Sequence, residues 1–293
     1  MRRAPASVWV LLGAGLLAFG SSPILIRLAD DAPAFALAAW RTTFVTGLLA
    51  PLALTRYRAE IGAFSRRDVG LVVVAGVLLG LHFMAWIASV QLTSVAAASV
   101  LVTTNPIMIA VLGAVFLKET PARRTQVAIA VAVVGATLIG LGEREGGTYP
   151  DPALGNALAL GAAFLVSVYL LIGRAVRQQT SFVAYFAPLN AVAALTCVAG
   201  CLLLNVPMGL DLPVLGLAFL MGVGPGLFGH GSFTVALRYL PAAFLGLLGL
   251  AEPVIASAIA FGWFGETPSA LALGGAVVIL VAIAAVVTSE REA

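Results

Sequence analysis

The chain has 293 residues, of which 61% are hydrophobic and only 10% are charged. A soluble domain averages about 25% charged residues, so no single soluble core could bury this much apolar surface, and we expect lipid to be the solvent. The net charge of +3 lies in short loops, where arginines set the orientation of membrane spans, so it does not indicate nucleic-acid binding.

Apolar runs separated by short polar breaks predict an all-α integral membrane protein with ten transmembrane helices. Each run is close to the roughly 20 residues that a helix needs to cross about 30 Å of hydrocarbon. Helices are favoured over a β-barrel because the runs are continuously apolar rather than alternating. The predicted spans are 7–28, 33–54, 69–90, 95–117, 122–142, 152–173, 181–204, 213–236, 242–264 and 269–288.

The first run follows Arg2 and Arg3, as the apolar part of a signal peptide would. We interpret it as a retained span because its counterpart in the second half, about 154–173, lies in the middle of the chain. The placement of basic residues predicts that both termini are cytoplasmic. In that orientation thirteen basic residues are cytoplasmic, and only Arg27 and Arg144 lie on the opposite side.

A shift of 147 positions aligns the chain with itself without a gap. Segment 105–106 (Asn-Pro) then falls on 252–253 (Glu-Pro), and segment 119–121 falls on 266–268, both Glu-Thr-Pro. The shift therefore indicates an internal repeat that occupies the whole chain.

The repeat predicts two units, 1–146 with spans one to five and 147–293 with spans six to ten. Five is an odd number, so the two units must cross the membrane in opposite directions. Inverted repeats of this kind are used by many secondary transporters to build a site near the bilayer midplane.

Glu252 lies near the centre of the ninth span, where a charged group costs about 2.5–3.5 kcal/mol. Pro253 removes a backbone hydrogen bond and predicts a kink or break there, as Pro106 does after Asn105 in the fourth span. We predict that Glu252 and Asn105 line a central cavity. The alternatives are a protonated Glu252 that hydrogen-bonds across helices, and an Asn105 that joins two helices for about 0.6 kcal/mol.

His82 and Trp86 lie four residues apart on one face of the third span. Together they would offer a polar and a stacking surface to a planar substrate in the cavity. Phe233 is the counterpart of Trp86 at the 147-residue shift, so an aromatic residue recurs at that place in both halves. The alternative is ordinary packing of the tryptophan beside a neutral, hydrogen-bonded histidine.

The eighth span carries Gly222, Gly226, His230 and Thr234 at steps of four. The glycines predict a close approach between helices. His230 is predicted to line the cavity near its cytoplasmic mouth.

Four further positions carry polar groups. Arg41 lies about two turns into the second span, where it could hold an anionic group, pair with an acid or extend outward to the interface. Tyr169 in the sixth span could hydrogen-bond a substrate or only pack. Glu119 and Glu266 lie at helix ends, where we expect ion pairs with neighbouring arginines rather than substrate contacts.

The sequence has no glycine-rich phosphate loop followed by lysine, and no Ser/His/Asp or HExxH arrangement. We therefore expect neither ATP drive within this chain nor an enzyme. Cys197 and Cys201 lie four residues apart, with no further Cys or His beside them to complete a metal site. We expect two small packing residues there, and no cofactor and no metal in the protein.

Two strings carry a resemblance to a known family: NPIMIAVLGAVFLKETP at 105–121 and EPVIASAIAFGWFGETP at 252–268. They resemble the EamA-type branch of the drug/metabolite transporter superfamily, and the resemblance covers essentially the whole chain. It implies a ten-helix exporter with inverted repeats and a central cavity. Members of that family carry amino acids, other metabolites, drugs or nucleotide sugars. Size, span layout and the aromatic residues at 86 and 233 make the chain most similar to bacterial exporters of aromatic amino acids.

The leading hypothesis is a multi-pass carrier of the bacterial inner membrane that exports amino acids, aromatic ones favoured, by alternating access. We expect a small-molecule substrate and the lipid bilayer as partners, and a monomer. Two alternatives stay open for the driving force: exchange with protons, or downhill facilitated movement. One alternative is efflux of cationic aromatic drugs, with Glu252 as the counter-charge. A membrane receptor or scaffold would need soluble domains or long tails, and a membrane enzyme would need a convergent catalytic cluster.

Overall fold

The computed structural model describes residues 4–142, 149–265 and 267–292. Ten helical segments within these residues are long and apolar enough to cross a membrane, which confirms the predicted number of spans. They are Ala6–Arg27, Ala34–Thr55, Arg66–Leu92, Ala97–Phe116, Arg123–Leu141, Pro152–Val176, Phe182–Leu203, Leu212–Ala236, Ala242–Trp263 and Ala270–Val287.

Several spans consist of more than one helix. The first five spans and their loops contain α1 (Ala6–Gly20), α2 (Ser22–Arg27), α3 (Ala34–Thr55), α4 (Arg58–Gly62), α5 (Arg66–Leu92), α6 (Val95–Val102), α7 (Asn105–Phe116) and α8 (Arg123–Gly142). The last five contain α9 (Pro152–Val176), α10 (Phe182–Leu203), α11 (Leu212–Met221), the π-helix η1 (Gly222–His230), α12 (Gly231–Ala236), α13 (Ala242–Gly249), α14 (Glu252–Phe264) and α15 (Ala270–Glu292).

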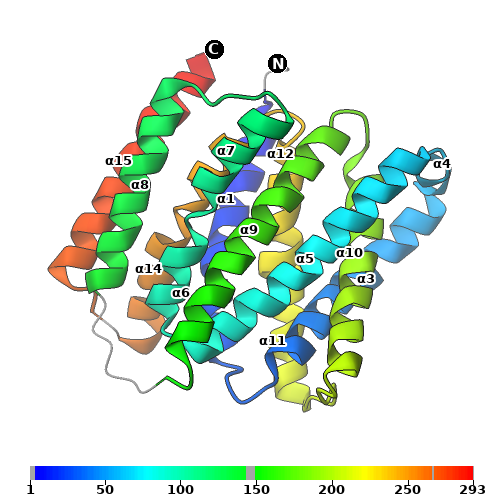
Figure 1. The fold of residues 1–293 in the computed structure, drawn as a ribbon, viewed down its shortest axis with the longest axis horizontal. Coiled ribbons are helices and arrows are strands. Elements are labelled where there is room, and N and C mark those ends of the chain that lie inside the picture. The colour runs from blue at the N-terminus through cyan, green and yellow to red at the C-terminus, as the bar shows by residue number, and fades with distance from the viewer. Residues whose placement is uncertain (1–3, 143–148, 266, 293) are drawn as a thin grey trace.

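The two halves have the same order of spans and pack on each other in matching pairs. The main interfaces join α5 with α9 and, at equivalent positions, η1 with α1. The second and seventh spans, α3 and α10, pack together at one side of the bundle, and the fifth and tenth, α8 and α15, lie side by side at the other (Figure 1). The N- and C-terminal ends of the described chain lie at the same end of the bundle, called the terminal end below (Figure 1). That this end faces the cytoplasm stays a prediction.

Small residues allow the closest helix approaches. A Cβ at Gly135 of α8 would lie 2.8 Å from the carbonyl oxygen of Gly275 on α15. A Cβ at Gly222 of η1 would lie 2.7 Å from the carbonyl oxygen of Arg41 on α3. Both contacts are with backbone, so glycine is required for these helices to touch, as expected where van der Waals packing holds membrane helices together.

The outer face of the bundle is apolar. Val111, Trp263, Val277 and Val281 are 59%, 70%, 60% and 62% exposed, on the helices α7, α14 and α15. Soluble proteins rarely expose contiguous apolar patches of this kind. Lipid contact explains the surface, because hydrocarbon replaces water as the solvent around the spans.

Arg174 ties three elements together at the terminal end. Its Nε donates to Glu119 Oε1 and Oε2 at 3.1 and 3.3 Å, and its Nη1 donates to the Leu237 carbonyl oxygen at 2.7 Å. The expected ion pair of Glu119 with an arginine is therefore present, and its partner comes from α9, in the other half. Glu266, for which we expected the same, lies outside the described residues.

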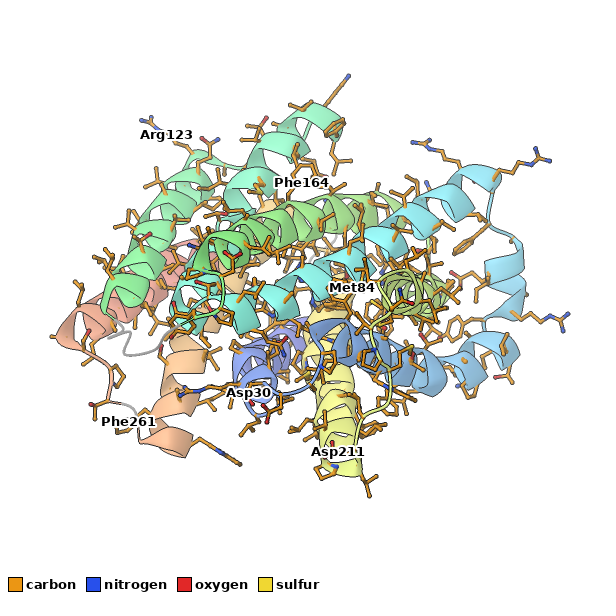
Figure 2. All side chains as sticks on the ribbon, turned by 60° about the horizontal axis from the view of Figure 1, so that its bottom comes forward. Asp30, Met84, Arg123, Phe164, Asp211 and Phe261 are labelled. Atoms are coloured by element: carbon orange, nitrogen blue, oxygen red, sulfur yellow. The ribbon has the colours of Figure 1, made fainter. Side chains whose placement is uncertain are left out.

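Charged side chains lie mainly at the two ends of the bundle. Figure 2 shows Arg123 at one end, and Asp30 and Asp211 at the other. The place of Arg123 is consistent with the positive-inside rule if the terminal end is cytoplasmic.

Candidate functional site

The fourth and ninth spans are both interrupted near their middle. In the fourth span α6 ends at Val102 and α7 begins at Asn105, and in the ninth α13 ends at Gly249 and α14 begins at Glu252. Residues 105 and 252, which the 147-residue shift pairs, are thus the first residues of two half-helices. The sequence predicted a midplane acid and amide, and the structure places both at equivalent helix breaks.

The prolines after these residues act differently from a proline inside a helix. Pro106 and Pro253 each occupy the first turn of the new half-helix. A first-turn N–H has no intrahelical acceptor, so proline removes no hydrogen bond there. The expected loss of a hydrogen bond within the span is therefore wrong, and the spans are broken rather than kinked. This position also stabilises a negative charge on the Glu252 side chain, because the N-terminus of a helix carries a partial positive charge.

A cavity of about 70 Å³ lies between the two breaks. Seven of the eight residues predicted to line a cavity do so: Arg41, His82, Trp86, Asn105, His230, Phe233 and Glu252. Asn105 and Glu252 are partly exposed, whereas Trp86 and Phe233 are 4% exposed. These residues come from the second, third, fourth, eighth and ninth spans, so the cavity is formed by both halves.

His230 lies at the centre of an aromatic cluster. Its ring centroid is 4.8 Å from that of Phe19, 5.0 Å from Phe83 and 5.8 Å from His82, and Phe19 is in turn 5.0 Å from Phe233. All four of these ring pairs meet edge to face, the arrangement in which the positive edge of one ring faces the negative face of another. The cluster gives the cavity one aromatic wall.

The backbone holds the ring of His82. Its Nδ1 lies 2.9 Å from the Ala162 carbonyl oxygen. A carbonyl oxygen can only accept, so Nδ1 carries a proton. The hydrogen bond that the sequence left open as an alternative is thus present, and His82 also lines the cavity.

Among the described residues that line the cavity, Arg41 is the one arginine or lysine, and it is buried. The residue is 1% exposed and its guanidinium carbon lies 4.0 Å from the centroid of the Phe83 ring. Extension outward to the membrane interface, one of the three possibilities for Arg41, is therefore excluded. Arg41 and Glu252 attract each other electrostatically but form no direct ion pair.

Tyr169 lies behind the cavity rather than in its lining. Its hydroxyl is 2.9 Å from Thr234 Oγ1, and that hydroxyl donates to the His230 carbonyl oxygen at 2.8 Å. Because the threonine proton is used in the second bond, Tyr169 donates in the first. Thr234 thus links the Tyr169 hydroxyl to the backbone of His230.

The eighth span does not keep the helical register on which its prediction depended. Residues 222–230 form a π-helix, so a step of four does not return to the same face. The predicted close approach nevertheless occurs at Gly222, against Arg41. His230 lies in the aromatic cluster, in contact with Phe19 and Phe83.

Two aromatic residues of the cavity, Phe19 and Phe83, were not predicted from the sequence. Apolar residues inside apolar spans give no contrast by which to find them. Phe83 could have been found, because it is the counterpart of His230 at the 147-residue shift. The repeat gives no such indication for Phe19. Its counterpart, Val166, also lines the cavity but is itself an apolar residue in an apolar span.

Ten membrane-crossing helices in two oppositely directed halves, with a cavity between two helix breaks, define a membrane transporter of small solutes. Comparison of the sequence with known families then identifies the group. The chain belongs to the EamA-like transporter family, whose profile matches residues 6–141 and again residues 153–288. It is thus a multi-pass membrane protein with ten helices.

Two individual proteins are also similar. The chain is 25% identical over 283 residues to solute carrier family 35 member G1 of Homo sapiens, covering 93% of this chain and 76% of that protein. A protein of known crystal structure matches 99% of this chain and 99% of its own length with a TM-score of 0.78 and 18% sequence identity, so the two share a fold.

Proposed function

We propose that this protein exports amino acids, aromatic ones favoured, across the bacterial inner membrane by alternating access. In this proposal the repeats 1–146 and 147–293 move relative to each other, both termini are cytoplasmic, and a single chain contains the complete path. Substrate would bind in the cavity between the two helix breaks.

The observation that carries the proposal is an acid facing an aromatic wall inside a membrane protein. Glu252 and the cluster of Phe19, Phe83, His230 and Phe233 line the same cavity. A carboxylate can hold a substrate ammonium group, and edge-to-face contacts are worth about 0.5–1.5 kcal/mol beyond area burial. An amino acid with an aromatic side chain carries both complementary groups.

The two ends of the path differ in this structure, which supports alternating access. A second cavity of about 60 Å³ lies between α2, α6 and α14 and is lined by Ser99 and Ala260 among others. Their counterparts at the 147-residue shift lie in different surroundings. Gly246 lines the central cavity, and a Cβ at Gly113 would lie 3.3 Å from Leu171. Equivalent positions of the two halves are therefore not in equivalent environments.

The size of the central cavity requires movement before a substrate can bind. Ligand pockets measure about 300–1,000 Å³, several times the roughly 70 Å³ found here. The helix breaks supply short half-helices that can tilt separately, so the cavity can widen without unfolding a span.

Uptake of radiolabelled phenylalanine, tryptophan and threonine into proteoliposomes tests the proposal. We expect saturable uptake of the two aromatic amino acids, lost in Trp86→Ala. The matched control is Trp263→Ala, which removes a tryptophan that is 70% exposed on the outer face, and it should retain uptake. Absence of saturable uptake of every amino acid by the wild-type protein would contradict the proposal.

Efflux of cationic aromatic drugs is the second candidate. Glu252 as counter-charge and the aromatic wall as a cation–π surface favour it. Uptake of a labelled dye-like cation separates the two, because a drug carrier would take it up, would be blocked by other dye-like cations and would be unaffected by excess phenylalanine or tryptophan.

A further inference from the structure

Arg41 is a permanently charged group without hydrogen-bond acceptors for two of its nitrogen atoms. Nε and Nη1 are buried and have no hydrogen-bond partner among the residues that the structure describes. The side chain lines the central cavity and its guanidinium stacks on Phe83. The stacking holds the guanidinium plane in place and uses none of its N–H groups in a conventional hydrogen bond.

A buried, charged side chain with unpaired donors lowers the stability of the folded protein. Arginine cannot lose its proton, and its guanidinium offers five N–H donors. A buried donor without an acceptor destabilises the protein, and more so when it is charged. The counterpart of Arg41 at the 147-residue shift is Pro188. The fold that the two halves share therefore does not require an arginine at this position.

The cavity lining contains one arginine and one glutamate, and the two come from different halves of the chain. Arg41 comes from α3 in the first half, and Glu252, the acid that attracts it, comes from α14 in the second half. The remaining titratable side chains that line the cavity are His82 and His230. A ligand that carries one positive and one negative group can satisfy both fixed charges at once.

We propose that Arg41 binds the carboxylate of the substrate and Glu252 its ammonium group, so that the cavity selects zwitterions. The substrate side chain then lies against Phe19 and Phe233. This inference rests on the proposed transport of amino acids and narrows it. A monocation meets repulsion from Arg41, and a monoanion meets repulsion from Glu252.

Three compounds with the same phenyl ring test the inference on the purified wild-type protein. Phenylalanine carries both charges, phenethylamine only the amine and 3-phenylpropionate only the carboxylate. We expect phenylalanine to bind at least about tenfold tighter than either of the others, since one charge-assisted interaction is lost in each. Equal binding of phenethylamine and phenylalanine would overturn the inference.

Substitution of Arg41 should reverse the preference. In Arg41→Gln we expect phenylalanine to bind about 10- to 100-fold more weakly and phenethylamine to bind more tightly than it does to wild type. Arg41→Lys keeps the charge but loses the forked pair of donors, so phenylalanine binding should be intermediate. Arg58→Gln, which makes the same change at an exposed residue of α4, should behave like wild type.

The outcomes separate this inference from the proposed function. If the wild-type protein transports no amino acid, the proposed function fails. If it transports phenylalanine but Arg41→Gln keeps the wild-type order of the three compounds, transport stands and the role of Arg41 is refuted. Should Arg41→Gln fail to fold, the wild-type comparison of the three compounds decides alone.

Discussion

Substitution of Gly222 tests how closely η1 must approach α3. In Gly222→Ala the new Cβ would lie 2.7 Å from the Arg41 carbonyl oxygen and 3.5 Å from Arg41 Cα. These are backbone atoms of a buried helix and cannot rotate away, so the two helices must separate. Forcing an extra carbon into a packed interface costs about 1–3 kcal/mol.

Gly224→Ala is the matched control for this change. Gly224 belongs to the same π-helix, and nothing lies within 4 Å of a Cβ built there. Both variants gain the same helix preference of alanine over glycine, about 0.5–1 kcal/mol. The difference between them therefore isolates the contact with Arg41, and we expect it to be about 1–3 kcal/mol.

Reversible unfolding from bicelles into sodium dodecyl sulfate, followed by tryptophan fluorescence, measures the free energy of unfolding of both variants. Gly224→Ala should match or exceed wild type, and Gly222→Ala should fall below it. Equal stabilities of the two variants would refute the close approach of η1 to α3, and with it the restraint of that approach on the backbone of Arg41.

Three further changes test other parts of the structure. In Glu252→Gln phenylalanine flux should fall, because the ammonium group loses its charged partner, and the flux that remains should no longer depend on a pH gradient, because glutamine cannot carry a proton; an unchanged dependence would exclude Glu252 as the coupling residue. Tyr169→Phe should lower the free energy of unfolding by about 0.5–1.5 kcal/mol through loss of the bond to Thr234 and leave the KM for phenylalanine unaltered, whereas a large rise in KM would mean that the hydroxyl reaches the substrate. Glu119→Gln should destabilise the protein by about 1 kcal/mol, because the glutamate side chain is 39% exposed and its pair with Arg174 is partly screened, while Asp31→Asn in an exposed loop should have no effect.

The number and placement of the spans could be predicted because hydrophobicity decides them. A run of apolar residues long enough to cross the bilayer has few alternatives to a helix, since lipid offers no partner to an unpaired peptide group. The repeat then located the two interruptions, because proline recurs at 106 and 253. The sequence did not show whether each proline bends one helix or begins another, since both arrangements contain the same residues.

Cavity-lining residues could be predicted where a polar residue occurs in an otherwise apolar span. Arg41, Asn105 and Glu252 are polar among apolar neighbours, and all three line it. Phe19 and Phe83 could not be singled out by contrast, because apolar residues fill both faces of every span. The pair of Arg174 with Glu119 was also hidden, since its members are 55 residues apart and meet only through the packing of α7 on α9.

The differences between the two repeats bear most directly on function. Where the halves agree, as at the prolines of the helix breaks, they share a requirement of the fold. Where they differ, the fold tolerates either residue, and the choice is free to serve binding. Arginine occurs at 41 where the second half has Pro188, and glutamate occurs at 252 where the first half has Asn105. Each half thus supplies one of the two fixed charges of the cavity, so a zwitterion held by both must contact both halves. A substrate bound in this way would draw the halves together with an energy that a singly charged compound cannot supply, and recognition would be coupled directly to the movement that transport requires.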